Sequence, residues 1–284
     1  MSDAVAPLAG RGPDPLRLLT LNLQHGTPAR GTAREDRATE GGALFAAAHE
    51  IAATGADVVL LQEVDRGQRR SGRVDQAALL ADELGMRWRF APSLAGSATG
   101  LRLPAVRATA PRLPGYGVAL LTRLPVRSWH VRRLRGGGPR VLRGGSPWWA
   151  ARAWSPRLDP ARVCLAAVLE TPGGPLSVAV THLSVDPPTA RRQLADAVAV
   201  LGALPGPRVL GGDLNLRPAE VAGVVADGGL TPLASAPTFT NARPRIQLDH
   251  LLGDGAVTAV SAARTHHLAI SDHAGLSVDV VLEH

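Results

Sequence analysis

Eight short apolar runs, rich in valine and leucine, recur along almost the whole chain and constrain its fold more than any other feature. Each run has the length of one strand, and glycine and proline turns or helical stretches separate the runs. Eight strands are enough for two sheets. The predicted strands are residues 17–23, 57–64, 117–126, 162–170, 176–183, 208–214, 246–252 and 275–283.

Helical patterns alternate with these runs. Apolar residues recur at spacings of three and four over residues 42–54, 75–86 and 188–203, which predicts three helices. The runs on either side of the turn sequence TPGG, at 171–174, predict an antiparallel hairpin. The stretch 95–160 is interrupted by glycines and prolines, and we expect long loops with two strands there.

No repeat or clear linker divides the 284 residues, which predicts a single α/β domain with mixed sheets over residues 16–284. Residues 1–15 are rich in Ala, Pro and Gly and are expected to form a disordered leader. This segment lacks the basic start and apolar core of a secretion signal, and no apolar run reaches the length of a membrane helix. We therefore expect a cytoplasmic protein without a transmembrane segment.

The basic residues are all arginine, and the chain contains no lysine. P-loop NTPases and pyridoxal enzymes are thereby excluded, because both need a lysine. A net charge of +7 carried by arginine is compatible with a phosphorylated or polyanionic partner, although the same composition is typical of a GC-rich genome. The single cysteine, Cys164, rules out an internal disulfide and a cysteine-cluster zinc site.

Polar side chains suited to catalysis lie at or just beyond the ends of several apolar runs. Each of them alone is compatible with a turn or a helix cap, but sites form preferentially where strands of α/β sheets give way to loops. The full set is Asn22, Glu63, His182, Asp213, Asn215, Asp249, Asp272 and His273.

The chemistry of this set favours a hard cation. Oxygen ligands such as those of Asn22, Glu63, Asp213 and Asp272 suit Mg²⁺ or Mn²⁺, whereas no HExxH or cysteine cluster indicates zinc. Histidines titrate near neutrality and can act as acids, bases or hydrogen-bond donors. Asp213 and Asn215 are two residues apart, so in an extended segment both point to one side, and the preceding glycines leave room for a substrate.

Seven segments lie in order over nearly the whole of residues 17–282: TLNLQHG, VVLLQEVD, YGVALLTRLPV, VTHL, GGDLN, QLDHLL and SDHAGLSVDV. In this order they resemble the motifs of the endonuclease/exonuclease/phosphatase superfamily, which includes deoxyribonuclease I-like nucleases, abasic-site endonucleases, inositol polyphosphate phosphatases and neutral sphingomyelinases. A motif such as GDLN is weak evidence alone, whereas the ordered set is strong evidence.

The resemblance implies a four-layered α/β sandwich, with two central mixed β-sheets flanked by helices. It also implies a metal site in which Glu63 is the main ligand and Asn22 and Asp272 lie nearby. The cofactor would be Mg²⁺ or Mn²⁺, acting as a Lewis acid on the scissile phosphate.

Catalytic roles follow from the same resemblance. Asp213 would position or deprotonate the attacking water, and Asn215 would hold the phosphate. His273, held by Asp249, would bond a phosphoryl oxygen or transfer a proton, and His182 would stabilise the transition state.

Some features depart from the family pattern or stay open. Val118 replaces an asparagine that many members carry, and Tyr116 is either a substitute for that amide in substrate binding or an aromatic that anchors a turn. Arg66, with the neighbouring Arg69, Arg70 and Arg73, is either part of a clamp for a remote substrate phosphate or of a solvated loop. Trp148, Trp149 and Trp154 could stack on bases, enter lipid or simply pack.

The sequence therefore predicts a metal-dependent hydrolase of phosphodiester or phosphomonoester bonds that uses in-line attack of an activated water. Its substrate is left open between DNA or RNA and inositol phosphates or phospholipids. A non-catalytic binder of nucleic acid or phospholipid is the competing class. No obligate protein partner is evident.

Overall fold

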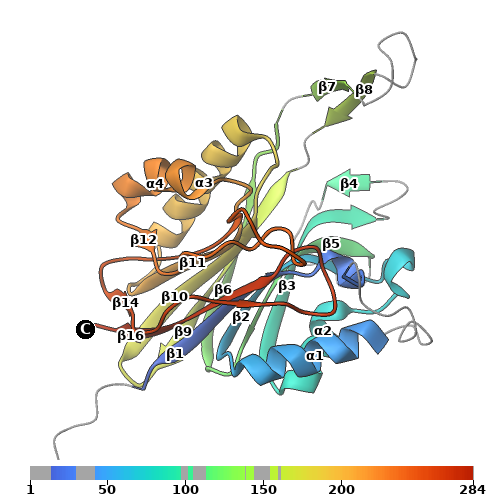
Figure 1. The fold of residues 1–284 in the computed structure, drawn as a ribbon. Helices are drawn as coiled ribbons and strands as arrows, with labels where there is room; N and C mark the ends of the chain where they lie inside the picture. The colour runs from blue at the N-terminus through green and yellow to red at the C-terminus, as the bar shows by residue number, and fades with distance from the viewer. Residues whose placement is uncertain are drawn as a thin grey trace, which may run out of the picture.

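Two β-sheets packed face to face form the centre of the protein in the computed structural model (Figure 1). The structure describes residues 14–29, 42–96, 113–137 and 161–283, together with the backbone of residues 102–104, 139–143 and 154–158. None of the helices in these ranges has the length and apolarity needed to cross a membrane.

The first sheet has eight strands in the described part of the chain, in the order β14-β16-β1-β2-β5-β3-β4, with β15 paired to β16. Only β1 and β2 run parallel, and every other pair is antiparallel. The strands are β1 (Leu16–Asn22), β2 (Val58–Arg66), β3 (Arg87–Gly96), β4 (Arg102–Pro104), β5 (Gly115–Thr122), β14 (Val257–Ala259), β15 (Arg264–His266) and β16 (Gly275–Leu282).

The second sheet has six described strands in the order β12-β13-β11-β10-β9-β6, and β10 and β11 are its parallel pair. A separate hairpin joins β7 (Pro139–Arg143) to β8 (Trp154–Leu158). The strands of the second sheet are β6 (Val126–Leu134), β9 (Arg162–Thr171), β10 (Gly174–His182), β11 (Arg208–Asp213), β12 (Thr231–Pro232) and β13 (Asp249–Gly253).

Helices cover the outer face of each sheet. The helices α1 (Gly42–Thr54) and α2 (Gln76–Leu84) pack on the first sheet, and α3 (Pro187–Gly202) and α4 (Pro218–Val225) pack on the second (Figure 1). Asp75 and Asp186 accept hydrogen bonds from the first turns of α2 and α3 and fix where these helices begin. The result is four layers, helix, sheet, sheet and helix.

Three apolar clusters hold these layers together. Leu60, Leu165 and Val178 belong to the cluster between the two sheets, while the other two clusters lie between each sheet and its helices. Strands buried on both faces must be apolar at successive positions. This explains why the sequence shows continuous Val/Leu runs rather than an alternating pattern.

Strand register brings the polar strand ends together. His182 is paired with Asp213 across the parallel strands β10 and β11, and Asp213 faces Asp249 across β11 and β13. Asn22 is paired with Gln62, one residue before Glu63, across β1 and β2. The two parallel pairs thus place their carboxyl ends at one edge of the sandwich.

The predicted four-layered α/β sandwich is confirmed. The three predicted helices and the hairpin formed by β9 and β10 are present close to their expected bounds. Two predicted strands were wrong in extent, because residues 117–126 divide at the turn after Thr122 and the strand expected from residue 246 begins at Asp249.

Several helices and strands of the structure were not predicted from the sequence. Helix α4 and strand β3 were not predicted, because α4 has only eight residues and β3 mixes polar and apolar residues without a clear period. The prediction of long loops with two strands over residues 95–160 contained too few strands, because β4, β5, β6, β7 and β8 all lie in this stretch. Trp148 and Trp149 lie outside the described residues.

Candidate active site

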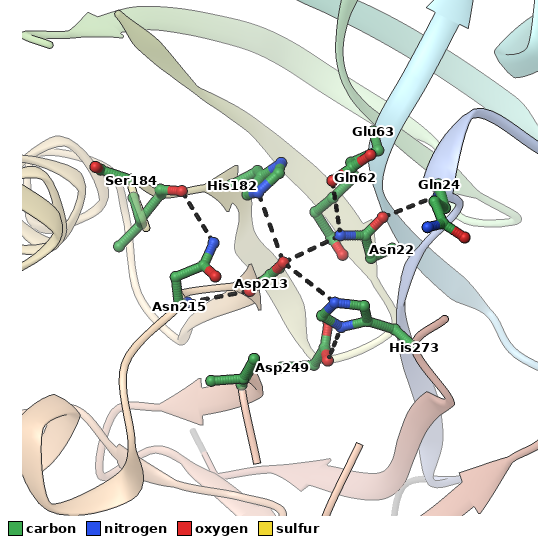
Figure 2. A network of polar contacts seen from close by, with 12 residues as sticks. Asn22, Gln24, Gln62, Glu63, His182, Ser184, Asp213, Asn215, Asp249 and His273 are labelled. Atoms are coloured by element: carbon green, nitrogen blue, oxygen red, sulfur yellow. Dashed lines mark hydrogen bonds and ion pairs between the residues drawn. The ribbon is translucent and has the colours of Figure 1, made fainter. Parts of the chain in front are cut away.

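Asp213, the last residue of β11, is the centre of a buried polar network (Figure 2). Its Oδ2 accepts a hydrogen bond of 3.0 Å from the Asn22 side chain and lies 3.6 Å from His182 Nε2 and 3.8 Å from His273 Nε2. Its Oδ1 accepts a hydrogen bond of 3.0 Å from the backbone N–H of Asn215. Burial and the nearby charge of Asp249 raise the pKa of Asp213 above its ordinary value. The carboxylate is therefore a better proton acceptor than an exposed aspartate.

His273 is held by a carboxylate behind it. Its Nδ1 lies 2.8 Å from Oδ2 of the fully buried Asp249, and its Nε2 faces Asp213. Burial opposes the charge of the ring, but the hydrogen bond and charge of Asp249 outweigh that effect and raise the pKa of His273 to about 9. The ring is an imidazolium at neutral pH, with one N–H directed into the site.

His182 has the opposite character. Burial, together with the positive charge of Arg162, lowers the pKa of His182 to about 3, so the ring is neutral. Arg162 opens β9, is itself buried, and its Nε has no hydrogen-bond partner among the described residues. A buried guanidinium N–H without a partner is costly, so this group is suited to an anion that enters the site.

Glu63 reaches the site through an irregularity in β2. The register between β2 and β5 shifts between Leu61 and Val64, and Glu63 has a positive φ of 53°. Bulges of this kind redirect a side chain and are common beside active sites. Burial opposes ionisation of this carboxyl, but its contacts with His25 and Asn22 lower the pKa of Glu63 to about 2. Glu63 is therefore a permanent anion at the rim of the network.

Asn215 follows Asp213 in a left-handed turn with a φ of 51°. Its side-chain amide donates a hydrogen bond of 3.1 Å to the carbonyl of Leu183, just beyond His182. The preceding Gly212 has a φ of 141°, and a Cβ at that position would lie 2.0 Å from the carbonyl oxygen of Thr181. The GGDLN segment thus needs glycine where β11 lies closest to β10.

Tyr116 and Arg66 have different surroundings. Tyr116 contacts His25 edge to face, with ring centroids 6.4 Å apart, and the guanidinium of Arg70 lies 5.2 Å from its ring centre. Arg66 stacks over Phe90 and donates a hydrogen bond to the carbonyl of Leu113. The contacts of Arg70 therefore lead toward the site through Tyr116.

A cavity of about 480 Å³ adjoins His273. Phe239 lies on its wall, with its ring centroid 5.0 Å from that of His273. Asp272 also lines this cavity, and its negative charge helps to raise the pKa of His273. The other lining residues are Gln24, Thr27, Pro28, Thr240, Asn241, Ala242 and Ser271.

The donor set fits a hard divalent cation. Among the described residues, polar atoms of Asp213, Asp249 and His273 all lie within 4.8 Å of one another, and Oδ1 of Asp249 is buried without a hydrogen-bond partner. While the His273 ring is protonated, the two carboxylates are the ligand atoms of this group. Glu63 adds an ionised carboxylate beside this group. The Asn22 side chain directs its nitrogen toward Glu63 and Asp213, while its oxygen accepts a hydrogen bond from the N–H of Gln24.

Sequence reasoning did not single out three residues of this neighbourhood, Arg162, Phe239 and His25. Arg162 starts an apolar run and looks like a surface boundary until the register of β9 is known. His25 was not among the candidate residues, yet its Nδ1 is 3.3 Å from Oε2 of Glu63. Its position three residues after Asn22, within the TLNLQHG segment, was the available signal.

The chain is thus a four-layered α/β sandwich with a buried polar site at one edge of both sheets. The model of the endonuclease/exonuclease/phosphatase family matches residues 19–273, and the chain belongs to this family. The family includes metal-dependent phosphoesterases, both nucleases and phosphatases. No protein with a curated description matches the chain.

Solved structures of the family are similar in fold. A family member from Bacteroides vulgatus shares 16% identity with a TM-score of 0.65, covering 95% of this chain and 99% of that one. The human Nocturnin catalytic domain with a bound sulfate anion shares 20% identity with a TM-score of 0.62 and covers 94% of both chains. A mannosyl-6-phosphatase from Bacteroides thetaiotaomicron shares 15% identity with a TM-score of 0.60, covering 94% of this chain and 100% of that one. At these identities the similarity shows the fold alone.

Proposed function

We propose that the protein is a Mg²⁺- or Mn²⁺-dependent phosphoesterase that hydrolyses phosphodiester bonds by in-line attack of an activated water. The observation that carries the proposal is the convergence of two histidines, a neutral His182 and a positively charged His273, on one buried carboxylate, Asp213. Membership of the endonuclease/exonuclease/phosphatase family supports the same reaction class.

Asp213 is the proposed base. Its raised pKa makes it able to accept the proton of a water molecule near neutral pH, and the N–H of Asn215 and the amide of Asn22 fix its orientation. The oxygen of this water then attacks phosphorus as the bond to the leaving oxygen breaks.

Three other groups of the site would hold the phosphate while charge builds up on its oxygens. His273, charged because Asp249 lies behind it, donates from Nε2, and Arg162 offers its unpartnered Nε–H. His182 is neutral and can donate a hydrogen bond without adding charge. Donors that are already in place before reaction stabilise the transition state most effectively.

Glu63 is the proposed main metal ligand, with Asn22 and Asp272 as further candidates. The ionised state of Glu63 and the unpartnered oxygen of Asp249 show a local excess of negative charge that suits a hard cation. A bound Mg²⁺ or Mn²⁺ would supply Lewis-acid stabilisation of the phosphoryl and leaving oxygens. As a ligand, Asn22 would need its amide group turned from the orientation described above.

The cavity beside His273 supports a diester over a polyphosphate. Its lining consists of amides, hydroxyls, an aromatic ring and the carboxylate of Asp272, and no basic residue of the described chain lines it. Such a cavity suits a neutral polar group, for example a sugar, attached to the scissile phosphate.

A substrate panel with and without metal tests the proposal. The purified protein should cleave bis-p-nitrophenyl phosphate with Mg²⁺ or Mn²⁺ and lose this activity in EDTA, and plasmid DNA, oligonucleotides, inositol phosphates and sphingomyelin then rank the natural classes. Asp213→Ala should lose turnover, whereas Asp227→Ala, on an exposed turn, should not. Absence of metal-dependent turnover on the whole panel, or full activity of Asp213→Ala, would contradict the mechanism.

A further inference from the structure

A groove of about 850 Å³ runs between the outer edge of β6 and helix α3. The strand β6 is the terminal strand of the second sheet, and Leu134 at its end packs in the core beneath α3. Alternation along the strand places His130 and Arg132 on the same side as Leu134, facing α3. The lining residues are His130, Val131, Arg132, Arg133, Arg135, Arg192, Ala195, Asp196, Ala199, Val200, Ala203 and Leu204.

The groove is strongly basic. Four arginines line it, against a single carboxylate, Asp196. Arg132, Arg135 and Arg192 are exposed, and none of them forms an ion pair with a described carboxylate. Arginines elsewhere on the same elements differ, because Arg127 of β6 pairs with Glu170 and Arg191 of α3 pairs with Glu220. The positive charge in the groove is thus available to an anionic ligand.

One end of the groove lies at the active-site edge of the sheet. Leu134 is paired with Arg162, the residue whose charge acts on His182. Gln193 of α3 connects the two places directly, since it donates to the carbonyl of Arg135 over 2.9 Å and accepts from the N–H of Ser184 over 2.9 Å. Ser184 is two residues beyond His182. A ligand that leaves the active site past this connection enters the groove at Arg135.

The dimensions suit a chain molecule rather than a small ester. From residue 135 back to residue 130 along β6, the extended chain covers about 17 Å at roughly 3.3 Å per residue. Along a stacked strand with a rise of about 3.4 Å, that length spans several nucleotides.

We propose that this groove binds the sugar-phosphate backbone of a single-stranded polynucleotide whose scissile phosphate lies at Asp213. The inference rests on the proposed phosphoesterase function and names its substrate class. The guanidinium groups of Arg132, Arg135 and Arg192 bind successive phosphates, while Val200 and Leu204, which also line the groove, provide apolar contact.

A matched pair of double variants tests this assignment. Arg132→Gln with Arg192→Gln removes two charges from the groove, and Arg127→Gln with Arg191→Gln removes two charges from the same strand and helix outside it. Binding of a fluorescently labelled single-stranded oligonucleotide is measured by anisotropy in EDTA across a salt series. Hydrolysis of bis-p-nitrophenyl phosphate with Mn²⁺ is measured separately.

The groove variant should bind the oligonucleotide at least about tenfold more weakly, and the slope of log K against log salt should fall by about 1.4, since each phosphate contact contributes about 0.7. The control variant should bind like the wild type, and both should hydrolyse the small diester at the wild-type rate. Equal losses in the two variants, or tighter binding of a duplex than of the single strand, would overturn the inference. Loss of diester hydrolysis in the wild type would instead overturn the proposed function, and the binding comparison would remain interpretable.

Discussion

Asp213 combines two properties that a single substitution can separate. It accepts hydrogen bonds from Asn22 and Asn215, and as an anion it lies in a buried site close to Asp249. Asp213→Asn keeps the shape and an acceptor oxygen but removes the proposed base and the repulsion. We expect turnover to fall by about 10²- to 10⁴-fold while the melting temperature stays the same or rises.

Hydrolysis of bis-p-nitrophenyl phosphate and thermal unfolding of the same preparation measure both effects, with Asp227→Asn on an exposed turn as the control. A melting temperature that falls together with activity would show that Asp213 serves mainly to hold the fold.

The charge of His273 depends on Asp249, which predicts a change in pH dependence. In the folded protein the pKa of His273 is raised from 6.5 to about 9. The folded state therefore binds more protons than the unfolded state between these values, and the resulting stabilisation is complete below pH 6.5 and lost as pH rises through about 9. In Asp249→Asn, burial lowers the pKa of His273 and this pH-dependent stabilisation disappears.

The imidazole signals of His273 in a nuclear magnetic resonance titration of the metal-free protein measure the pKa directly. The alkaline limb of kcat/KM should move to lower pH in Asp249→Asn if the imidazolium is needed for activity. An unchanged titration would show that Asp249 does not hold the proton on this ring. Asp254→Asn, just beyond the opposite end of β13, is the control.

Among the secondary-structure elements, β11 depends on a glycine that no other residue can replace without movement. Gly212 combines a φ of 141° with a position where a Cβ would lie 2.0 Å from the Thr181 carbonyl oxygen. Gly212→Ala should lower the free energy of unfolding by at least about 2 kcal/mol, because backbone strain and a clash with β10 act together.

Gly223→Ala is the matched control, since this glycine lies inside α4 and a Cβ there meets nothing within 4 Å. That substitution should raise stability by about 0.5–1 kcal/mol. Chemical denaturation of the two variants checks both signs, and a mild effect of Gly212→Ala would mean that β10 and β11 can separate at little cost.

Most of the fold and of the candidate site could be predicted from the apolar strand patterns and from the polar residues at the strand ends. The runs that form β2, β10 and β11 are buried at almost every position, so their places follow from hydrophobicity alone, and the polar residues near their ends are visible in the sequence. The contribution of Arg162 was not predictable, because it depends on the antiparallel register of β9 against β10. The redirection of Glu63 by a bulge is likewise a property of the pairing with β5. Short elements such as α4 contain too few residues for a periodic signal.

At the scale of the whole molecule, the two sheets meet at one edge. There the carboxylates outnumber the positively charged side chains that could neutralise them. Glu63 comes from the first sheet, while Asp213 and Asp249 come from the second. A cation bound between them would link the two halves of the sandwich. Binding to the folded state alone stabilises a protein in proportion to the logarithm of ligand concentration.

This argument predicts that Mg²⁺ or Mn²⁺ raises the melting temperature. At about one hundred times the dissociation constant the gain is about 2.7 kcal/mol, which corresponds to a rise of about 5–10 °C in a domain of this size. Glu63→Gln should lose most of the rise, whereas Glu83→Gln, exposed on α2, should retain it. Thermal unfolding in EDTA and in each metal gives the comparison. An equal metal-induced rise in melting temperature in both variants would show that the cation binds away from Glu63. No rise in the wild type would show that the folded protein does not bind the cation.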